Sequence, residues 1–143
     1  MFVKQISVFV ENTRGALSKV TGILAENGIN IRALSIADTT DFGILRLIVQ
    51  DPYKAETVLK ANDIAVKSTD VIAVAISDRP SGLHDALAVL RDADVTVEYM
   101  YAFVCRSDCE AYVIVKTDNP ETALGALESG GVKVLSSNDV YEL

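Results

Sequence analysis

Apolar residues recur with the spacing of strands and helices from the start of the chain. The alternating segment Lys4–Val10 predicts a strand with one apolar face. A helical stripe follows within residues 16–27, and Gly28 stands where a helix commonly ends. The apolar positions of this strand and helix are Ile6, Val8, Val10, Leu17, Val20, Ile23 and Leu24. The opening of the chain therefore predicts a strand, a turn and a helix.

The following segment predicts two more strands, a second helix and a fourth strand. Two apolar segments, 29–36 and 44–50, flank the turn-rich sequence ADTTDFG. Asp51-Pro52 combines a capping acceptor with a proline at the first helical position, so we expect a helix from there to about Asn62. A short strand is expected at Ile64–Lys67.

The whole pattern then occurs a second time. Equivalent apolar residues lie 66 positions apart, and the pairs are Ile6 and Ile72, Leu17 and Leu83, Leu24 and Leu90, and Ile31 and Val97. Expected elements of the second copy are strands at 71–76, 95–104, 111–116 and 132–135, with helices starting near Leu83 and after Asn119-Pro120. Repetition at a fixed offset with the same element order indicates duplicated structural units.

The repeat predicts an α+β fold made of two ferredoxin-like βαββαβ units. We expect two antiparallel sheets packed side by side, each with its helices on one face. The first unit is expected to span residues 1–70 and the second residues 71–143. The connection near Ser68-Thr69-Asp70 is too short for a flexible linker, so the units are expected to pack together.

Composition and charge narrow the class of function. The chain has 143 residues, half of them hydrophobic, and no apolar run approaches the roughly 18 residues of a membrane helix. The N-terminal segment lacks the features of a secretory signal, which favours a cytoplasmic protein. Thirteen basic against 20 acidic residues give a net charge of −7, and such a surface repels phosphate backbones. We therefore expect no nucleic acid and no membrane as partner.

One turn raises a functional question, because a glycine stands where the first helix should begin. The turn reads ENTRGAL, and Gly15 occupies that position. It could be an ordinary strand-to-helix turn with Asn12 as a helix cap. Alternatively, a ligand could approach the backbone there, because the first N–H groups of a helix are unpaired and favour a carboxylate by about 0.3–2 kcal/mol. Asn12 and Asn30 each offer a donor and an acceptor to an amino acid.

The turn ENTRGAL after a strand, and AENGINI at the end of the next helix, resemble the ACT domain. This family of small-molecule-binding modules belongs to amino-acid metabolism, and the whole chain resembles a stand-alone tandem ACT protein. The resemblance implies a ligand between two modules, held by the turn of one module and the start of the second strand of the other. The implied ligand-binding residues are Asn12, Thr13, Arg14, Gly15, Ala16, Leu17, Asn30 and Ile31 in the first repeat, and Asp78, Pro80, Ser81, Gly82, Leu83 and Thr96 in the second.

The sequence departs from the family pattern at three places. Arg14 stands where proline is common, Asp78 occupies the asparagine position of the second repeat, and Ser81-Gly82 shifts the second glycine by one residue.

Other residues that could carry chemistry favour structural roles. Cys105 and Cys109 bracket an expected hairpin turn and are interpreted as reduced thiols, although a redox pair is an alternative. Together with the single histidine, His84, they fall short of the four ligands of a structural zinc site. No nucleophile elbow, dinucleotide-binding glycine motif or phosphate-binding loop is present. We expect no catalytic residue, no metal and no cofactor, and hence a protein that is not an enzyme.

Two functions remain open. In the first, a free amino acid binds between modules and allosterically changes the shape or assembly of the protein, which is expected to be a homodimer. In the second, the chain is a regulatory subunit that docks on an enzyme of amino-acid metabolism or on a transcription regulator. The sequence does not identify the amino acid, and small apolar, hydroxylated and aromatic ones all remain open.

Overall fold

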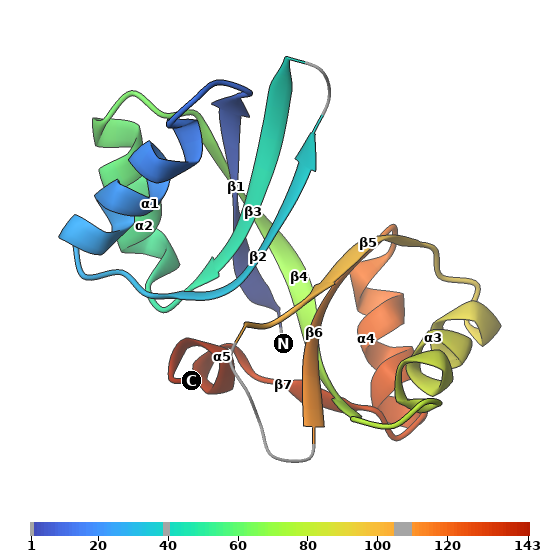
Figure 1. The fold of residues 1–143 in the computed structure, drawn as a ribbon. Coiled ribbons are helices and arrows are strands. Elements are labelled where there is room, and N and C mark those ends of the chain that lie inside the picture. The colour runs from blue at the N-terminus through green and yellow to red at the C-terminus, as the bar shows by residue number, and fades with distance from the viewer. Residues whose placement is uncertain (1, 39–40, 105–109) are drawn as a thin grey trace. The chain divides into compact units, whose positions relative to one another are not determined.

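The computed structural model describes residues 2–38, 41–104 and 110–143, and their helices and strands follow the doubled order (Figure 1). The first set is β1 (Val3–Glu11), α1 (Ala16–Glu26), β2 (Ile31–Asp38), β3 (Phe42–Val49), α2 (Pro52–Ala61) and β4 (Val66–Ser77). The second set continues from β4 with α3 (Gly82–Asp92), β5 (Val97–Ala102), β6 (Glu110–Thr117), α4 (Pro120–Ser129) and β7 (Lys133–Leu135). A short helix, α5 (Ser137–Tyr141), follows.

Two compact units divide the chain. The first unit consists of Lys4–Thr69 together with Tyr141–Leu143. The second consists of Asp70–Val140 and the few residues before Lys4. Strand β4 thus starts in the first unit and continues into the second.

The first unit has strand order β2-β3-β1-β4, with α1 and α2 on one face of the sheet (Figure 1). Antiparallel pairing of β1 with β3 places Ile6 opposite Leu47 and Val8 opposite Leu45. These side chains are buried with the apolar stripe of the two helices, including Val20, Leu24 and Leu59. The apolar face of β1 and the apolar stripe of α1 therefore pack together in one core.

The second unit repeats this arrangement with order β5-β6-β4-β7 and with α3 and α4 on one face (Figure 1). Its core contains Ile72, Leu90 and Leu127, which are buried. Even a local irregularity is repeated, because the register shifts near the start of β2, between Ile31 and Ala33, and near the start of β5, between Val97 and Tyr99. The predicted fold class, two βαββαβ repeats of the α+β type, is confirmed.

One predicted connection is instead part of a strand. Ser68, Thr69 and Asp70 lie within β4, which extends through them without a break. This segment contains no glycine or proline to stop a strand, and the Ser68 hydroxyl donates a 2.7 Å hydrogen bond to the Glu56 carboxylate on α2. Hydrogen bonds from Lys60 and Ser68 lower the pKa of Glu56.

The helix α5 was absent from the sequence prediction. Ser136 and Asp139 begin it with reciprocal bonds: the Ser136 N–H donates to the Asp139 carboxylate, and the Asp139 N–H donates to the Ser136 hydroxyl. These two hydrogen bonds lower the pKa of Asp139. Tyr141 is then held within the first unit, where its hydroxyl accepts from the Lys4 N–H at 3.0 Å and its carbonyl accepts from Arg32 at 3.1 Å.

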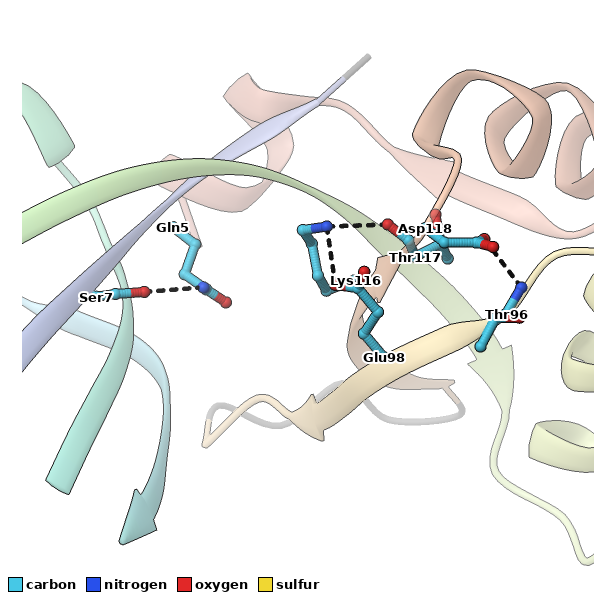
Figure 2. Close-up of polar contacts among 7 residues, drawn as sticks. All are labelled: Gln5, Ser7, Thr96, Glu98, Lys116, Thr117 and Asp118. Carbon is cyan, nitrogen blue, oxygen red and sulfur yellow. Dashed lines mark hydrogen bonds and ion pairs between the residues drawn. The ribbon is translucent and has the colours of Figure 1, made fainter. Parts of the chain in front are cut away.

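A buried threonine marks a chemical difference between the repeats. Ile31 pairs with Val49 in the first unit, and Val97 pairs with Thr117 in the second, so Val49 and Thr117 are equivalent. Thr117 is 1% exposed, and its hydroxyl has no hydrogen-bond partner among the described residues. The residues on either side of Thr117 do make hydrogen bonds, as Figure 2 shows. Lys116 donates to the Glu98 carboxylate, and the Asp118 carboxylate accepts from the Thr96 N–H.

We expect Thr117→Val to stabilise the protein, because valine has the same shape without the unpaired hydroxyl. A buried hydroxyl without a partner costs about 1–3 kcal/mol, and the free energy of unfolding should rise by up to that amount. Urea denaturation measures the change. The matched variant Val49→Thr should lower the free energy of unfolding. A loss of stability in Thr117→Val would mean that the hydroxyl has a partner.

Candidate functional site

The turn after β1 presents the predicted ligand residues at the surface. Asn12, Thr13, Arg14, Gly15 and Leu17 are exposed, and Ala16 is half-buried. Backbone hydrogen bonds fix the turn, because the Asn12 N–H donates to the Asp41 carbonyl at 2.9 Å and the Thr13 N–H donates to the Glu11 carbonyl at 2.8 Å. Gly15 holds the N-cap position of α1.

Gly15 is required by its backbone conformation. Its φ is +83°, in the left-handed region that favours glycine, and a Cβ built there would have no heavy atom within 4 Å. The space over the backbone is therefore open. Since glycine has no side chain to cap the helix, the first N–H groups of α1 receive no bond from their own N-cap residue.

The second helix of each unit begins differently. Asp51 accepts a hydrogen bond from the Lys54 N–H at the start of α2, and Asn119 accepts one from the Thr122 N–H at the start of α4. These caps were predicted from the sequence pairs Asp51-Pro52 and Asn119-Pro120. Side-chain capping by the N-cap residue is thus present at α2 and α4 and missing at α1.

Asn30 and Ile31 lie at the other end of the same sheet. Strand β3 pairs its first residue, Phe42, with Glu11 and its last residue, Val49, with Ile31. The turn that follows Glu11 and the start of β2 are therefore separated by the length of β3. One unit cannot bring Asn12 and Asn30 to the same ligand.

The equivalent turn of the second repeat is built differently. Ser81 holds the N-cap position of α3 with a φ of −93° and caps no N–H group. Its hydroxyl instead accepts a hydrogen bond from the Arg79 guanidinium, which also contacts the Asp85 carboxylate at 3.0 Å. Asp78 and Pro80 are exposed beside them, as is Leu83.

Gly82 is required by close packing and not by its backbone conformation. It is buried, and a Cβ at this position would lie 2.0 Å from the Ser77 carbonyl oxygen. The start of α3 thus packs directly on the end of β4. Thr96, at the far end of this unit, is exposed, and its N–H donates to the Asp118 carboxylate at 3.0 Å.

Each turn borders a pocket formed within its own unit. The first has a volume of about 570 Å³ and includes Thr13, Arg14, Gly15 and Ala16 in its lining. Sequence reasoning missed its other walls, which are Phe9, Val10, Glu11, Lys19, Val20, Phe42, Asp63, Ile64 and Ala65. Phe9 could have been identified from the sequence, because it is a large apolar residue that is out of phase with Ile6 and Val8 in β1.

The remaining candidates lie elsewhere. His84 is exposed in the first turn of α3, and Cys105 and Cys109 lie outside the described residues. Within the described ranges, no three side chains of histidine, cysteine, aspartate or glutamate gather as a metal site would require. None of the helices described is long and apolar enough to cross a membrane.

The chain contains two βαββαβ units, and in each unit the first helix begins beside a pocket without a side-chain cap from its N-cap residue. The model of the ACT domain pair family matches residues 1–143. The chain therefore belongs to the ACT domain pair family, as the sequence resemblance implied.

Known proteins resemble the chain over different lengths. Protein BT0572 from Bacteroides thetaiotaomicron has a solved structure with 40% identity and a TM-score of 0.94, covering 100% of this chain and 98% of that one. The regulatory subunit of aspartate kinase from Thermus thermophilus shares the fold at 18% identity, with a TM-score of 0.63 over 89% of this chain and 91% of that one.

A curated relative matches over part of its length. The acetolactate synthase isozyme 3 small subunit of Escherichia coli is 33% identical over 79 residues, which are 55% of this chain and 47% of that protein. The match therefore spans about half of that relative.

The two turn glycines should respond differently to alanine. In Gly15→Ala the new methyl group has open space, but the alanine backbone must adopt the left-handed conformation. We therefore expect the free energy of unfolding to fall by about 1–2 kcal/mol. Gly82→Ala places a methyl group against backbone, and we expect a loss of about 3 kcal/mol or more. Chemical denaturation of both variants provides the comparison. Equal losses would contradict the distinct origins of the two glycines.

Proposed function

We propose that this chain is a cytoplasmic, non-catalytic regulatory protein that binds a free amino acid between ACT modules. The carboxylate is received by the turn Asn12–Leu17, and the start of β2 in a second module supplies Asn30 and Ile31. Binding changes the shape or assembly of the protein. The second-repeat residues Asp78, Pro80, Ser81, Gly82, Leu83 and Thr96 form the equivalent candidate positions.

The observation that carries the proposal is the open helix start at Gly15. An uncapped helix N-terminus offers oriented N–H groups and partial positive charge, and both favour a carboxylate. The left-handed φ of Gly15 and the empty space around it leave the backbone accessible. Net acidity of the chain does not oppose this, because the field at one helix start is local.

A second copy of the chain is the simplest source of the other half of the site. Asn12 and Asn30 lie at opposite ends of one sheet, so a ligand that meets both residues must lie between two modules. Strand β2 ends the strand order of its unit and exposes Leu34 and Ile36, which are 42% and 46% exposed. An apolar strand at a sheet edge favours pairing with another chain, which supports a homodimer.

Thermal unfolding in the presence of each free amino acid tests the proposal. A ligand at 100 times its dissociation constant adds about 2.7 kcal/mol to stability, so at least one amino acid should raise the melting temperature clearly. Asn12→Ala should abolish the rise and leave the unliganded protein folded. Asn138→Ala, an exposed asparagine on α5, is the matched control and should retain the rise. Folded protein that responds to no amino acid would refute the proposal.

Mixing two inactive variants separates a shared site from a site within one chain. Asn12→Ala and Asn30→Ala should each lose the ligand. When the two variants are unfolded and refolded together, mixed dimers regain one intact site, and about a quarter of the wild-type capacity should return if subunits combine at random in a twofold dimer. If the mixed dimers regain no binding, both residues of one site lie on the same chain.

A second candidate function is that of a subunit that docks on an enzyme of amino-acid metabolism or on a transcription regulator. The names of the curated relatives favour it, because several are small subunits of acetolactate synthase. The expected result is co-elution of the chain with an acetolactate synthase catalytic subunit in size-exclusion chromatography. Leu34→Lys should weaken the complex if the exposed edge at β2 is the docking surface. Separate elution at micromolar concentration would exclude that enzyme as a stable partner.

A further inference from the structure

The starts of β2 and β5 are held by the same backbone hydrogen bond. In the first repeat the Gln50 N–H donates to the Asn30 carbonyl at 3.1 Å, and in the second repeat the Asp118 N–H donates to the Thr96 carbonyl at 3.1 Å. Gln50 directly follows β3, and Asp118 directly follows β6. Gln50 and Asp118 are therefore equivalent residues, and their side chains can be compared.

The two side chains differ in hydrogen-bonding chemistry. Glutamine has N–H donors as well as an acceptor, whereas an ionised aspartate can only accept. The Gln50 amide donates to the Gly28 carbonyl, beyond the end of α1, at 3.2 Å. The Asp118 carboxylate instead accepts from the Thr96 N–H at 3.0 Å, as Figure 2 shows. In the second repeat, the side chain thus bonds to the N–H group of the strand start itself.

The first repeat leaves the corresponding N–H group open. Within residues 2–38, 41–104 and 110–143, the Asn30 N–H and the Asn30 carboxamide make no hydrogen bond. Asn30 is exposed, so both groups are accessible. An oxygen atom of a ligand would find a free donor at Asn30, whereas at Thr96 it would have to displace the Asp118 carboxylate.

The charges beside the two strand starts also differ. The Asp118 carboxylate repels a ligand carboxylate in the second repeat. In the first repeat the Lys54 ammonium donates to the Asn27 carbonyl at 2.7 Å, and the acidic neighbour Asp51 accepts from the Lys54 N–H as the cap of α2. Thr122 holds the position of Lys54 in the second repeat, three residues after the helix cap. A cation thus contacts the segment before β2, and an anion contacts the segment before β5.

We infer that Asp118 closes the strand start of the second repeat, because its carboxylate occupies the N–H group that the first repeat leaves open to a ligand. Of the two candidate positions, Asn30 contacts the amino acid and Thr96 does not. The internal carboxylate does not pay the entropic cost of binding a free molecule, so it competes effectively with one. This inference rests on the proposed function and adds the residue that determines which strand start takes part.

Amide hydrogen exchange of the full chain, followed by NMR without any ligand, tests the bond at Thr96. After correction for intrinsic rates, the Thr96 amide should exchange about tenfold more slowly than the Asn30 amide, because a bonded N–H exchanges only when the bond opens. Asp118→Ala should remove this protection, and Asp118→Asn should retain part of it through the amide oxygen. Fast exchange of Thr96 in the wild-type chain, or unchanged protection in folded Asp118→Ala, would overturn the inference.

Moving the carboxylate into the first repeat tests its effect on binding. The probes are the twenty standard L-amino acids, and one that raises the melting temperature of the wild-type chain is titrated by calorimetry into Gln50→Asp and Gln50→Ala. Both variants lose the bond to the Gly28 carbonyl, but only Gln50→Asp supplies a carboxylate for the Asn30 N–H. We expect the dissociation constant of Gln50→Asp to exceed that of Gln50→Ala by about tenfold. Circular dichroism melts show that both variants are folded.

The outcomes separate this inference from the proposed function. Equal dissociation constants for folded Gln50→Asp and Gln50→Ala would refute the closure of a strand start by a carboxylate and leave amino-acid binding intact. A wild-type chain that binds none of the twenty amino acids would refute the proposed function, and the role of Asp118 in excluding a ligand would be refuted with it.

Discussion

Antiparallel pairing of the first and third strands of each unit is the constraint on which the other features depend. In the first unit it aligns Ile6 and Val8 with Leu47 and Leu45, which creates the apolar face that α1 and α2 cover. It also directs the end of β1 into the turn before α1. Because β2 pairs with the other edge of β3, the start of β2 is fixed at the opposite end of the sheet. Core, turn and the separation of Asn12 from Asn30 thus share one cause.

The two repeats preserve this geometry and differ in chemistry. Strand order, helix placement and even the register shift at the start of the second strand are shared. Differences concentrate where the backbone does not depend on them, on the walls of the two pockets and at Val49 and Thr117. A lysine can replace an aspartate at the start of a helix without changing the fold, because exposed charges contribute little to stability. Duplication therefore leaves the fold constant and the surface chemistry free to diverge.

Local patterns were sufficient to predict most elements of the fold. The caps at Asp51 and Asn119 follow from two-residue signals, and the offset of 66 revealed the doubled unit. Features that depend on distant residues were missed. Tyr141 is held by Lys4 and Arg32, far away in the sequence, and Ser68, in the part of β4 that was expected to be a connection, donates a hydrogen bond to Glu56 on α2. Of the candidate site, the turn could be predicted, but the walls from Phe42 and Asp63 could not, since tertiary packing alone brings them to Phe9.

The two turn glycines also bear on the history of the duplication. Tandem copies of a gene tend to exchange sequence, which keeps them alike. Here an exchanged turn would place serine at the left-handed position of Gly15 in one copy, or alanine against the Ser77 carbonyl in the other. Either hybrid loses stability before any ligand is considered. Each turn is therefore suited only to its own copy, because each glycine meets a requirement that the other turn does not have.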